Sequence, residues 1–236
     1  MEIEFLFYIV CVLIIGYLIM GICTTIFCRL SNPLLNLCKK GKTLCLTFDD
    51  GIDPRYTPLL LDILENNKIK ASFFILASTI KNNEDILQRM IENGHTIGFH
   101  SMNHKNQITQ FPTILYNDFK RSIKIFEKNN VKISYYRPPW GHITPLGILF
   151  CKMFNLKMVL WTVIIGDWSQ RVSVNMLRDR LCKKANGSAV ICLHDGRGKN
   201  EAPLRTIAVL KEMIPYWKKE GYTFETISEF YEKNSC

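Results

Sequence analysis

The chain lacks the sequence features of several common protein classes. Its 30 Lys and Arg residues outnumber its 21 Asp and Glu residues, but they form no run of five basic residues and no basic stretch interleaved with aromatics. This argues against a nucleic-acid-binding protein. The nine cysteines include no CxxC pair, so nothing indicates a zinc ribbon or requires disulfides. The net charge of +9 suits an anionic membrane or a cell-surface glycan better.

Charge is absent from one long segment near the start of the chain. Residues Phe5 to Cys28 include no charged side chain over 24 positions, more than the roughly 20 apolar residues that cross a bilayer. A cleaved signal peptide is the alternative, but the preceding residues are acidic and the run exceeds the usual ~7–15 residues. The sequence therefore predicts a single transmembrane anchor over residues 1–28 and a linker over residues 29–41.

The charges on either side of this span predict an orientation. Acidic residues precede the span and basic residues follow it: Glu2 and Glu4 before, and Arg29, Lys39, Lys40 and Lys42 after. Because basic residues favour the cytoplasmic side, this bias places the remainder of the chain in the cytoplasm.

Beyond the linker, two hydrophobic periodicities alternate, and they predict the fold class. Short apolar, β-branched or aromatic runs occur at 43–48, 71–76, 96–99, 133–137, 157–163, 189–193 and 222–227. Helical patterns separate them, at 57–67, 84–94, 113–130, 144–154, 173–187 and 204–221. Strands that alternate with helices of this length indicate an α/β fold with a parallel sheet, either closed as a barrel or open and doubly wound. One domain over residues 42–236 is expected.

Polar residues follow several of the predicted strands. Those at the strand ends are Asp49, Asp50 and Gly51, then His100 and His104, Arg137, Asp167 and Trp168, and His194. Ligands bind at the carboxyl ends of parallel strands in both barrels and open sheets. The same relative position in successive βα units makes these residues the candidates for a functional site.

The spacing of His100 and His104 is compatible with a metal site. On a helical turn, two residues four apart project from one face, although two solvated loop histidines are the alternative. Ser101 occupies the position where a metalloprotease HExxH motif requires glutamate, which excludes that class. A third ligand is needed, and an aspartate from the first strand would complete a two-histidine, one-carboxylate set with open coordination positions.

The adjacent pair Asp49 and Asp50 fits such a site. If the chain is extended through both residues, their side chains point to opposite sides, so that one can face a metal and the other the substrate. A metal cation and Arg137 would each favour an ionised carboxylate. Gly51 would permit a sharp turn that leaves both exposed.

These residues resemble the five ordered motifs of the polysaccharide deacetylases, carbohydrate esterase family 4, which carry the NodB homology domain. The motifs are Thr47-Phe-Asp-Asp-Gly51, His100-Ser-x-x-His104, Arg137-Pro-Pro-Trp-Gly141, Asp167-Trp168 and Leu193-His194-Asp195. The resemblance covers about residues 42 to 230. It implies a distorted (β/α) barrel of about seven parallel strands, here preceded by one transmembrane helix.

The resemblance also implies roles for the site residues. Asp49 would be the general base, while Asp50, His100 and His104 would bind one divalent metal ion, usually Zn²⁺ and sometimes Co²⁺ or Mn²⁺. His194 would be the general acid.

The other motif residues would support this chemistry. Arg137 would hold Asp49, and Asp167 would tune that arginine. The backbone N–H of Trp140 would bind the oxyanion, and Trp168 and Leu193 would wall the pocket for the acetyl methyl group. We also expect Asp195 to orient the ring of His194.

Two positions depart from the family pattern. Ile164 lies where the family often has an aspartate, and Trp140 lies where it often has a tyrosine. A backbone donor survives a side-chain change, so Trp140 is compatible with catalysis, although it can alter the groove.

The resemblance implies a membrane-anchored, metal-dependent deacetylase acting on an N-acetylated glycan such as peptidoglycan. That substrate requires an extracytoplasmic domain, against the charge bias. Three alternatives remain: a deacylase of a lipid-linked or other small N-acyl sugar, a non-catalytic glycan-binding relative, and a non-haem iron oxygenase. No nucleic-acid or protein partner is expected.

Overall fold

The computed structural model describes residues 2–38, 41–198 and 200–234, and its centre is a parallel β-sheet. The strands are β1 (Thr43–Asp49), β2 (Ser72–Ile75), β3 (Thr96–Phe99), β4 (Tyr135–Tyr136), β5 (Lys157–Met158), β6 (Val163–Ile164), β7 (Ala189–His194) and β8 (Thr223–Phe224). Their order is β5-β4-β3-β2-β1-β7-β6, and β8 pairs with the start of β1. Within the described residues no pairing joins β5 to β6. The predicted α/β barrel is therefore confirmed as a half-barrel.

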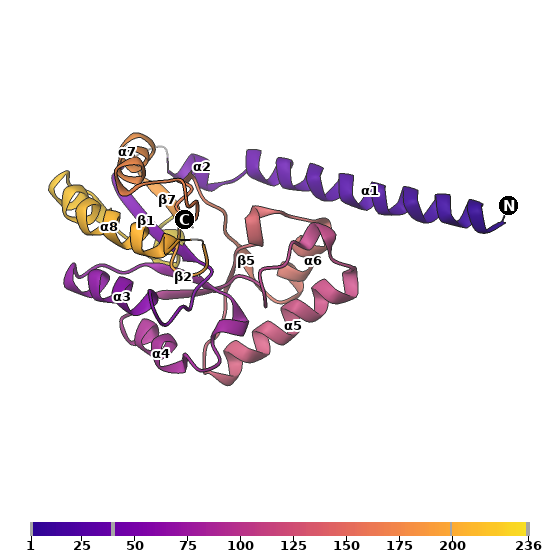
Figure 1. Cartoon of the computed structure of the whole chain (residues 1–236), viewed down its shortest axis with the longest axis horizontal. Coiled ribbons are helices and arrows are strands. Elements are labelled where there is room, and N and C mark those ends of the chain that lie inside the picture. Colours follow the sequence, from indigo (N-terminus) through magenta and orange to yellow (C-terminus); the bar gives the residue numbers. More distant parts are fainter. Residues whose placement is uncertain (1, 39–40, 199, 235–236) are drawn as a thin grey trace.

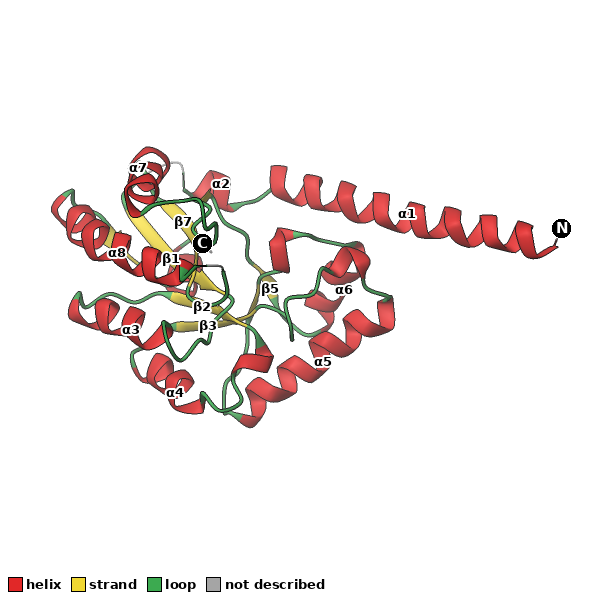
Figure 2. Ribbon diagram, viewed as in Figure 1, coloured by secondary structure: helices red, strands yellow, loops and turns green. Residues whose placement is uncertain are grey.

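The helices of the α/β unit lie outside the sheet (Figure 2). They are α3 (Thr57–Asn66), α4 (Glu84–Glu92), α5 (Pro112–Lys128), α6 (Pro145–Met153), α7 (Val174–Lys184), α8 (Ala202–Lys219) and α9 (Ile227–Lys233). Three 3₁₀ turns connect elements, η1 (Ala77–Thr79), η2 (Gln107–Thr109) and η3 (Pro139–Gly141). All six predicted helical segments form helices. Helix α9 was not predicted; its capping box at Thr226 and Glu229 ends the run that we expected to be a strand.

The alternation of side chains along the central strands divides the interior into two parts. Leu44, Leu46 and Phe48 of β1 belong to the main hydrophobic core, whereas Cys45 belongs to a second, smaller cluster on the other face. Thr47 and Asp49 share the face of Cys45, because successive side chains alternate. The polar end of β1 is thereby directed away from the main core.

The predicted strand over 157–163 is interrupted, and Arg137 explains why. Its guanidinium donates to the carbonyls of Val159 (3.3 Å) and Leu160 (3.2 Å). These carbonyls are satisfied by a side chain rather than by a neighbouring strand. The run therefore divides into β5 and β6.

Helix α1 (Glu2–Leu30) projects from the sheet-containing part of the molecule (Figure 1). It is long and apolar enough to cross a membrane, and its first half is almost entirely exposed. The predicted linker contains the short helix α2 (Leu34–Leu37), and Leu34 is fully buried in the second hydrophobic cluster. Lys39 and Lys40, on which part of the charge bias depends, lie outside the described residues.

Candidate active site

A cavity of about 440 Å³ opens at the carboxyl ends of the central strands. Most of the predicted site residues line it, namely Asp49, Asp50, His100, His104, Trp140, Trp168 and His194. Arg137 and Asp167 are fully buried behind this lining. The strand ends thus bring together residues that are up to 145 positions apart in the sequence.

Asp50, His100 and His104 form a three-residue group whose ligand atoms all lie within 4.8 Å of one another. Asp50 Oδ1 is 3.2 Å from His104 Nε2 and 3.6 Å from His100 Nε2. His100 Nδ1 donates to the backbone carbonyl of Arg137 at 2.7 Å, which leaves the Nε2 lone pair directed at the group.

The hydrogen bonding of this group fits a cation site. Asp50 Oδ1 is buried and has no hydrogen-bond partner among the described residues. Buried polar atoms are nearly always satisfied, so such an atom requires an explanation. One carboxylate and two imidazoles that leave coordination positions open are a common donor set for a divalent metal ion. The residues therefore fit a metal site.

The pKa values of Asp50 and His104 are also those expected of metal ligands. Burial raises the pKa of Asp50, and the charge of Asp49 adds to this, although His100 and His194 oppose it. A cation would relieve the penalty on the Asp50 carboxylate. Burial, with the charge of His100, lowers the pKa of His104 to about 3. His104 is thus neutral, the form that binds metals.

The two histidines meet for a different reason from the one predicted. Residues 100–104 form a loop, not a helical turn, and Ser101 and His104 have positive φ angles of 75° and 55°. The loop is closed by His104 N, which donates to Ser101 Oγ at 2.8 Å. The expected helical geometry was wrong, although the two rings do lie side by side with centroids 5.1 Å apart.

The aspartate pair also departs from the expected geometry. Strand β1 ends at Asp49, and Asp50 has a φ of 75°, so the chain is not extended through both residues. Both carboxylates face the same cavity, and both are buried rather than exposed. Gly51 is required by close packing, since a Cβ there would lie 2.5 Å from Asp195 Oδ2.

Asp49 is held by a buried ion pair, as the resemblance implies. Arg137 Nη1 donates to Asp49 Oδ1 and to Thr47 Oγ1, each at 2.7 Å. Burial alone would raise the pKa of Asp49, but the charges of Arg137, His100 and His194 outweigh it and hold the pKa below its usual range. Asp49 is therefore a carboxylate that can accept a proton.

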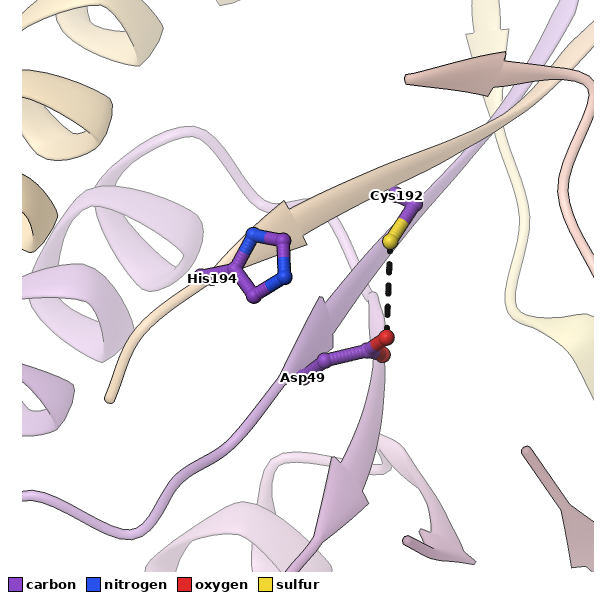
Figure 3. Close-up of side chains that lie close together, drawn as sticks. All are labelled: Asp49, Cys192 and His194. Carbon is purple, nitrogen blue, oxygen red and sulfur yellow. Dashed lines mark hydrogen bonds between the residues drawn. The ribbon is translucent and has the colours of Figure 1, made fainter. Parts of the chain in front are cut away.

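Figure 3 shows the other side of Asp49, where β1 and β7 lie next to each other. The Cys192 thiol donates to Asp49 Oδ2 at 3.4 Å. Burial raises the pKa of Cys192, so the thiol stays protonated. Asp49, Cys192 and His194 form a second close group of potential ligand atoms. In this group Asp49 is already engaged by Arg137 and by the thiol.

Asp167 contacts His194 rather than Arg137, which corrects the expectation that it tunes the arginine. Its two carboxylate oxygens accept from His194 Nδ1 at 2.9 Å and from His194 N at 2.8 Å. Asp195, expected to orient the ring, instead accepts from Thr57 Oγ1 at 2.6 Å. Burial lowers the pKa of His194, but Asp167, Asp49 and Asp50 outweigh it and raise the pKa to about 9. His194 can therefore hold a proton at neutral pH.

Aromatic residues wall the cavity, whereas Leu193 does not. Trp140 and Trp168 are both about half exposed at the rim, and Trp168 lies edge-on to the His194 ring with centroids 5.1 Å apart. Leu193 is fully buried in the main core. Side chains alternate along β7, so Cys192 shares the cavity face with His194. The alternation along residues 189–194 could have identified Cys192 from the sequence.

Four further lining residues were not predicted: Arg29, Trp161, Arg197 and Gly198. Arg29, the last-turn residue of α1, donates to the backbone carbonyl of Trp140 at 2.6 Å. No sequence pattern connects it to the site. Ile164, the departure from the family pattern, also lines the cavity.

Comparisons with known proteins agree with this geometry. A family model described as polysaccharide deacetylase matches residues 36–159. A peptidoglycan-N-acetylglucosamine deacetylase from Bacillus cereus is 34% identical over 190 residues, which cover 80% of this chain and 87% of the relative.

Solved structures show the same fold. A crystal structure of a peptidoglycan N-acetylglucosamine deacetylase aligns with a TM-score of 0.75 at 26% identity, covering 82% of this chain and 89% of that chain. A family 4 acetyl xylan esterase from Clostridium thermocellum, in complex with a cobalt ion, aligns with a TM-score of 0.74 at 25% identity, covering 83% and 93%. The chain therefore belongs to the polysaccharide deacetylase family, carbohydrate esterase family 4, and is a hydrolase of that family.

Proposed function

We propose that this protein is a membrane-anchored, metal-dependent deacetylase that removes the acetyl group from an N-acetylated sugar of a polysaccharide such as peptidoglycan. One observation carries the proposal: Asp49 paired with Arg137, His194 paired with Asp167 and the Asp50–His100–His104 group all line a single cavity. The substrate named for the Bacillus cereus relative supports an N-acetylglucosamine unit.

The residues divide the work of amide hydrolysis between a base and an acid. Asp49 takes a proton from the attacking water, because Arg137 keeps it ionised. His194 gives a proton to the departing amine nitrogen, because Asp167 keeps it protonated and oriented. The two pKa values are displaced in the directions that these roles require.

Asp50, His100 and His104 would hold the metal ion. This donor set suits Zn²⁺ best, with Co²⁺ or Mn²⁺ as substitutes. When bound, the ion supplies Lewis acidity, which polarises the acetyl carbonyl and lowers the pKa of water. The Trp140 backbone N–H would stabilise negative charge on the carbonyl oxygen, and Trp168 would enclose the acetyl methyl group.

The proposed organisation is an anchor over residues 1–28, a linker over 29–41 and a catalytic domain over 42–236. The uncharged helix α1 supports a single membrane span. We place the domain on the extracytoplasmic face, where peptidoglycan is accessible, although the basic residues after the span favour the opposite face. Protease digestion of intact cells and of opened vesicles would decide between the two orientations.

Acetate release from N-acetylglucosamine oligomers and from peptidoglycan tests the activity. The full chain in detergent should release acetate, lose the activity on chelation and regain it when Zn²⁺, Co²⁺ or Mn²⁺ is added. Metal-independent release, or no release from any N-acetylated glycan by fully metallated protein, would contradict the proposal.

A lipid-linked N-acyl sugar is a second candidate substrate, and the position of Arg29 favours it. This cation lies at the end of the proposed span and lines the cavity, so it could contact an anionic group between sugar and lipid. Faster acetate release from a lipid-diphosphate-linked N-acetyl sugar than from free oligomers would favour this substrate. Equal rates would exclude a role for the lipid.

A further inference from the structure

Helix α1 is docked against the catalytic domain along its second half. Tyr17 donates its hydroxyl to the carbonyl of Gln110 at 3.2 Å. Thr25 Oγ1 accepts from Ile143 N at 2.7 Å and donates to Ile143 O at 3.0 Å. Gly21 allows the close approach between these contacts, since a Cβ there would lie 3.2 Å from Ile108 Cγ1. A flexible tether would make no such series of bonds.

This docking overlaps the segment that must lie in the bilayer. The uncharged run is Phe5 to Cys28, and its central residues are those around Gly16 and Tyr17. A hydrocarbon core of ~30 Å needs roughly 20 helical residues. The part of α1 before the docked region, Phe5 to Val12, covers only about 12 Å at about 1.5 Å per residue. A span confined to the undocked part is too short.

The overlap places part of the catalytic domain at the depth of the middle of the span. A groove between α1 and the domain is lined by Leu13, Ile14, Tyr17 and Leu18 on the helix and by residues 108–112 on the domain. Residues 108–114 form what we call the membrane edge. It includes Ile108 and Thr109 of η2 and the first three residues of α5.

The composition of the membrane edge is that of a lipid-facing surface. Phe111 is 68% exposed and Ile114 is 54% exposed, although both are large and apolar. Phe111 is the N-cap residue of α5 and Ile114 lies in its first turn. Lys105 is also exposed and precedes the edge by three residues. Large apolar side chains exposed beside a membrane-spanning helix are typical of a surface that enters the membrane interface.

We propose that the membrane edge is inserted into the lipid bilayer beside α1, so that the catalytic cavity is held at the membrane surface. The inference rests on the membrane anchor of the proposed function and adds a second, independent lipid contact. Arg29 then lies at the end of the span and also lines the cavity. Substrates are therefore N-acetylated sugars close to the bilayer, which a domain on a long tether would not require.

Photo-crosslinking to lipid tests the proposal on the full chain. The residue p-benzoylphenylalanine is placed in turn at Phe111, Ile114, Leu6 and Leu59, and the protein is reconstituted in vesicles of phosphatidylcholine and phosphatidylglycerol. Leu6 is exposed on the undocked part of α1, and Leu59 is exposed on α3, away from α1 (Figure 1). After irradiation, mass spectrometry detects lipid adducts. A thermal unfolding curve that matches the unsubstituted protein shows that each variant is folded.

Adducts are expected at Phe111, Ile114 and Leu6 but not at Leu59. Adducts at Leu6 without adducts at Phe111 and Ile114 would overturn the inserted edge while leaving the anchor intact. Absence of an adduct at Leu6 would overturn both. Adducts to a second protein copy at Phe111 would show that protein, not lipid, covers the edge, and would also overturn the proposal. Acetate release is measured separately, so the proposed deacetylation can fail independently of either lipid contact.

Discussion

The two sides of the catalytic cavity differ in how their polar atoms are satisfied. On one side, Arg137 bonds Asp49 and Asp167 bonds His194, each at hydrogen-bond distance. On the other side, Asp50 Oδ1 and His104 Nδ1 are buried and have no partner among the described residues. Both sides place carboxylates next to basic side chains. Only the first side satisfies all of these groups with hydrogen bonds from the described residues.

The two sides of the cavity therefore have different requirements for stability. A satisfied network holds a charge or a proton in place, so its members have shifted pKa values and fixed orientations. An unsatisfied group of carboxylate and imidazole ligands needs a cation to be stable in a buried site. In the proposed function, the first side transfers protons and the second side holds the metal ion. The following predictions separate the two.

The largest effect is expected when a metal ligand is removed. Asp50→Ala or His104→Ala should abolish stoichiometric metal binding and lower acetate release about a thousandfold or more, because several kcal/mol of transition-state stabilisation are lost. Metal content by mass spectrometry and acetate release are measured together. His142→Ala is the matched control, a histidine near the rim that should retain both. Full metal occupancy in either ligand variant would place the metal elsewhere.

Replacement of the base should separate metal binding from turnover. Asp49→Asn should retain metal and lower kcat by about 10²–10⁴-fold, the usual contribution of a general base. The amide oxygen can still accept from Arg137, and a thermal unfolding curve checks that the buried arginine is tolerated. Loss of metal from this variant would mean that the two adjacent aspartates have the opposite roles.

A change at Asp167 should move the pH dependence of the reaction. The acid must be protonated, so activity falls as pH rises through the pKa of His194, which Asp167 helps to raise to about 9. Asp167→Asn removes that charge, so the alkaline limb of the kcat profile should shift to lower pH. A bound cation lowers the pKa in both proteins, so the shift between them is the quantity to measure.

Asp195→Asn is the control for this shift, because Asp195 bonds Thr57 and not the His194 ring. Its alkaline limb should stay in place. An equal shift in both variants would show that the effect is general and does not come from the Asp167–His194 pair.

The smallest effect is expected at Cys192. Cys192→Ala removes the weak donor to Asp49 Oδ2 and should lower kcat by no more than about tenfold, the equivalent of about 1.4 kcal/mol. Cys192→Ser keeps a donor and should recover most of the loss. A large loss in both variants would mean that the size of the side chain, rather than its hydrogen bond, matters at this position.

Sequence patterns were reliable where the physics is local. Period-two apolar runs located the longer strands, helical periodicity located six helices, and the position of polar residues after strands identified most of the cavity lining. They failed where backbone conformation depends on distant partners. The 157–163 run is interrupted because Arg137, some 20 residues earlier, donates hydrogen bonds to two of its backbone carbonyls. The expected geometry at Asp50 and His104 failed because both residues adopt positive φ.

The sequence alone determined the fold class, the family and the identity of the polar side chains at the strand ends, because these depend on periodicity, motif order and residue chemistry. Only the tertiary structure decided which partner each side chain takes. It assigned Asp167 to His194 and Asp195 to Thr57. It alone also brought Arg29 to the cavity and docked α1 on the domain. Such pairings depend on how separate strands and helices pack together, and no spacing along the chain encodes them.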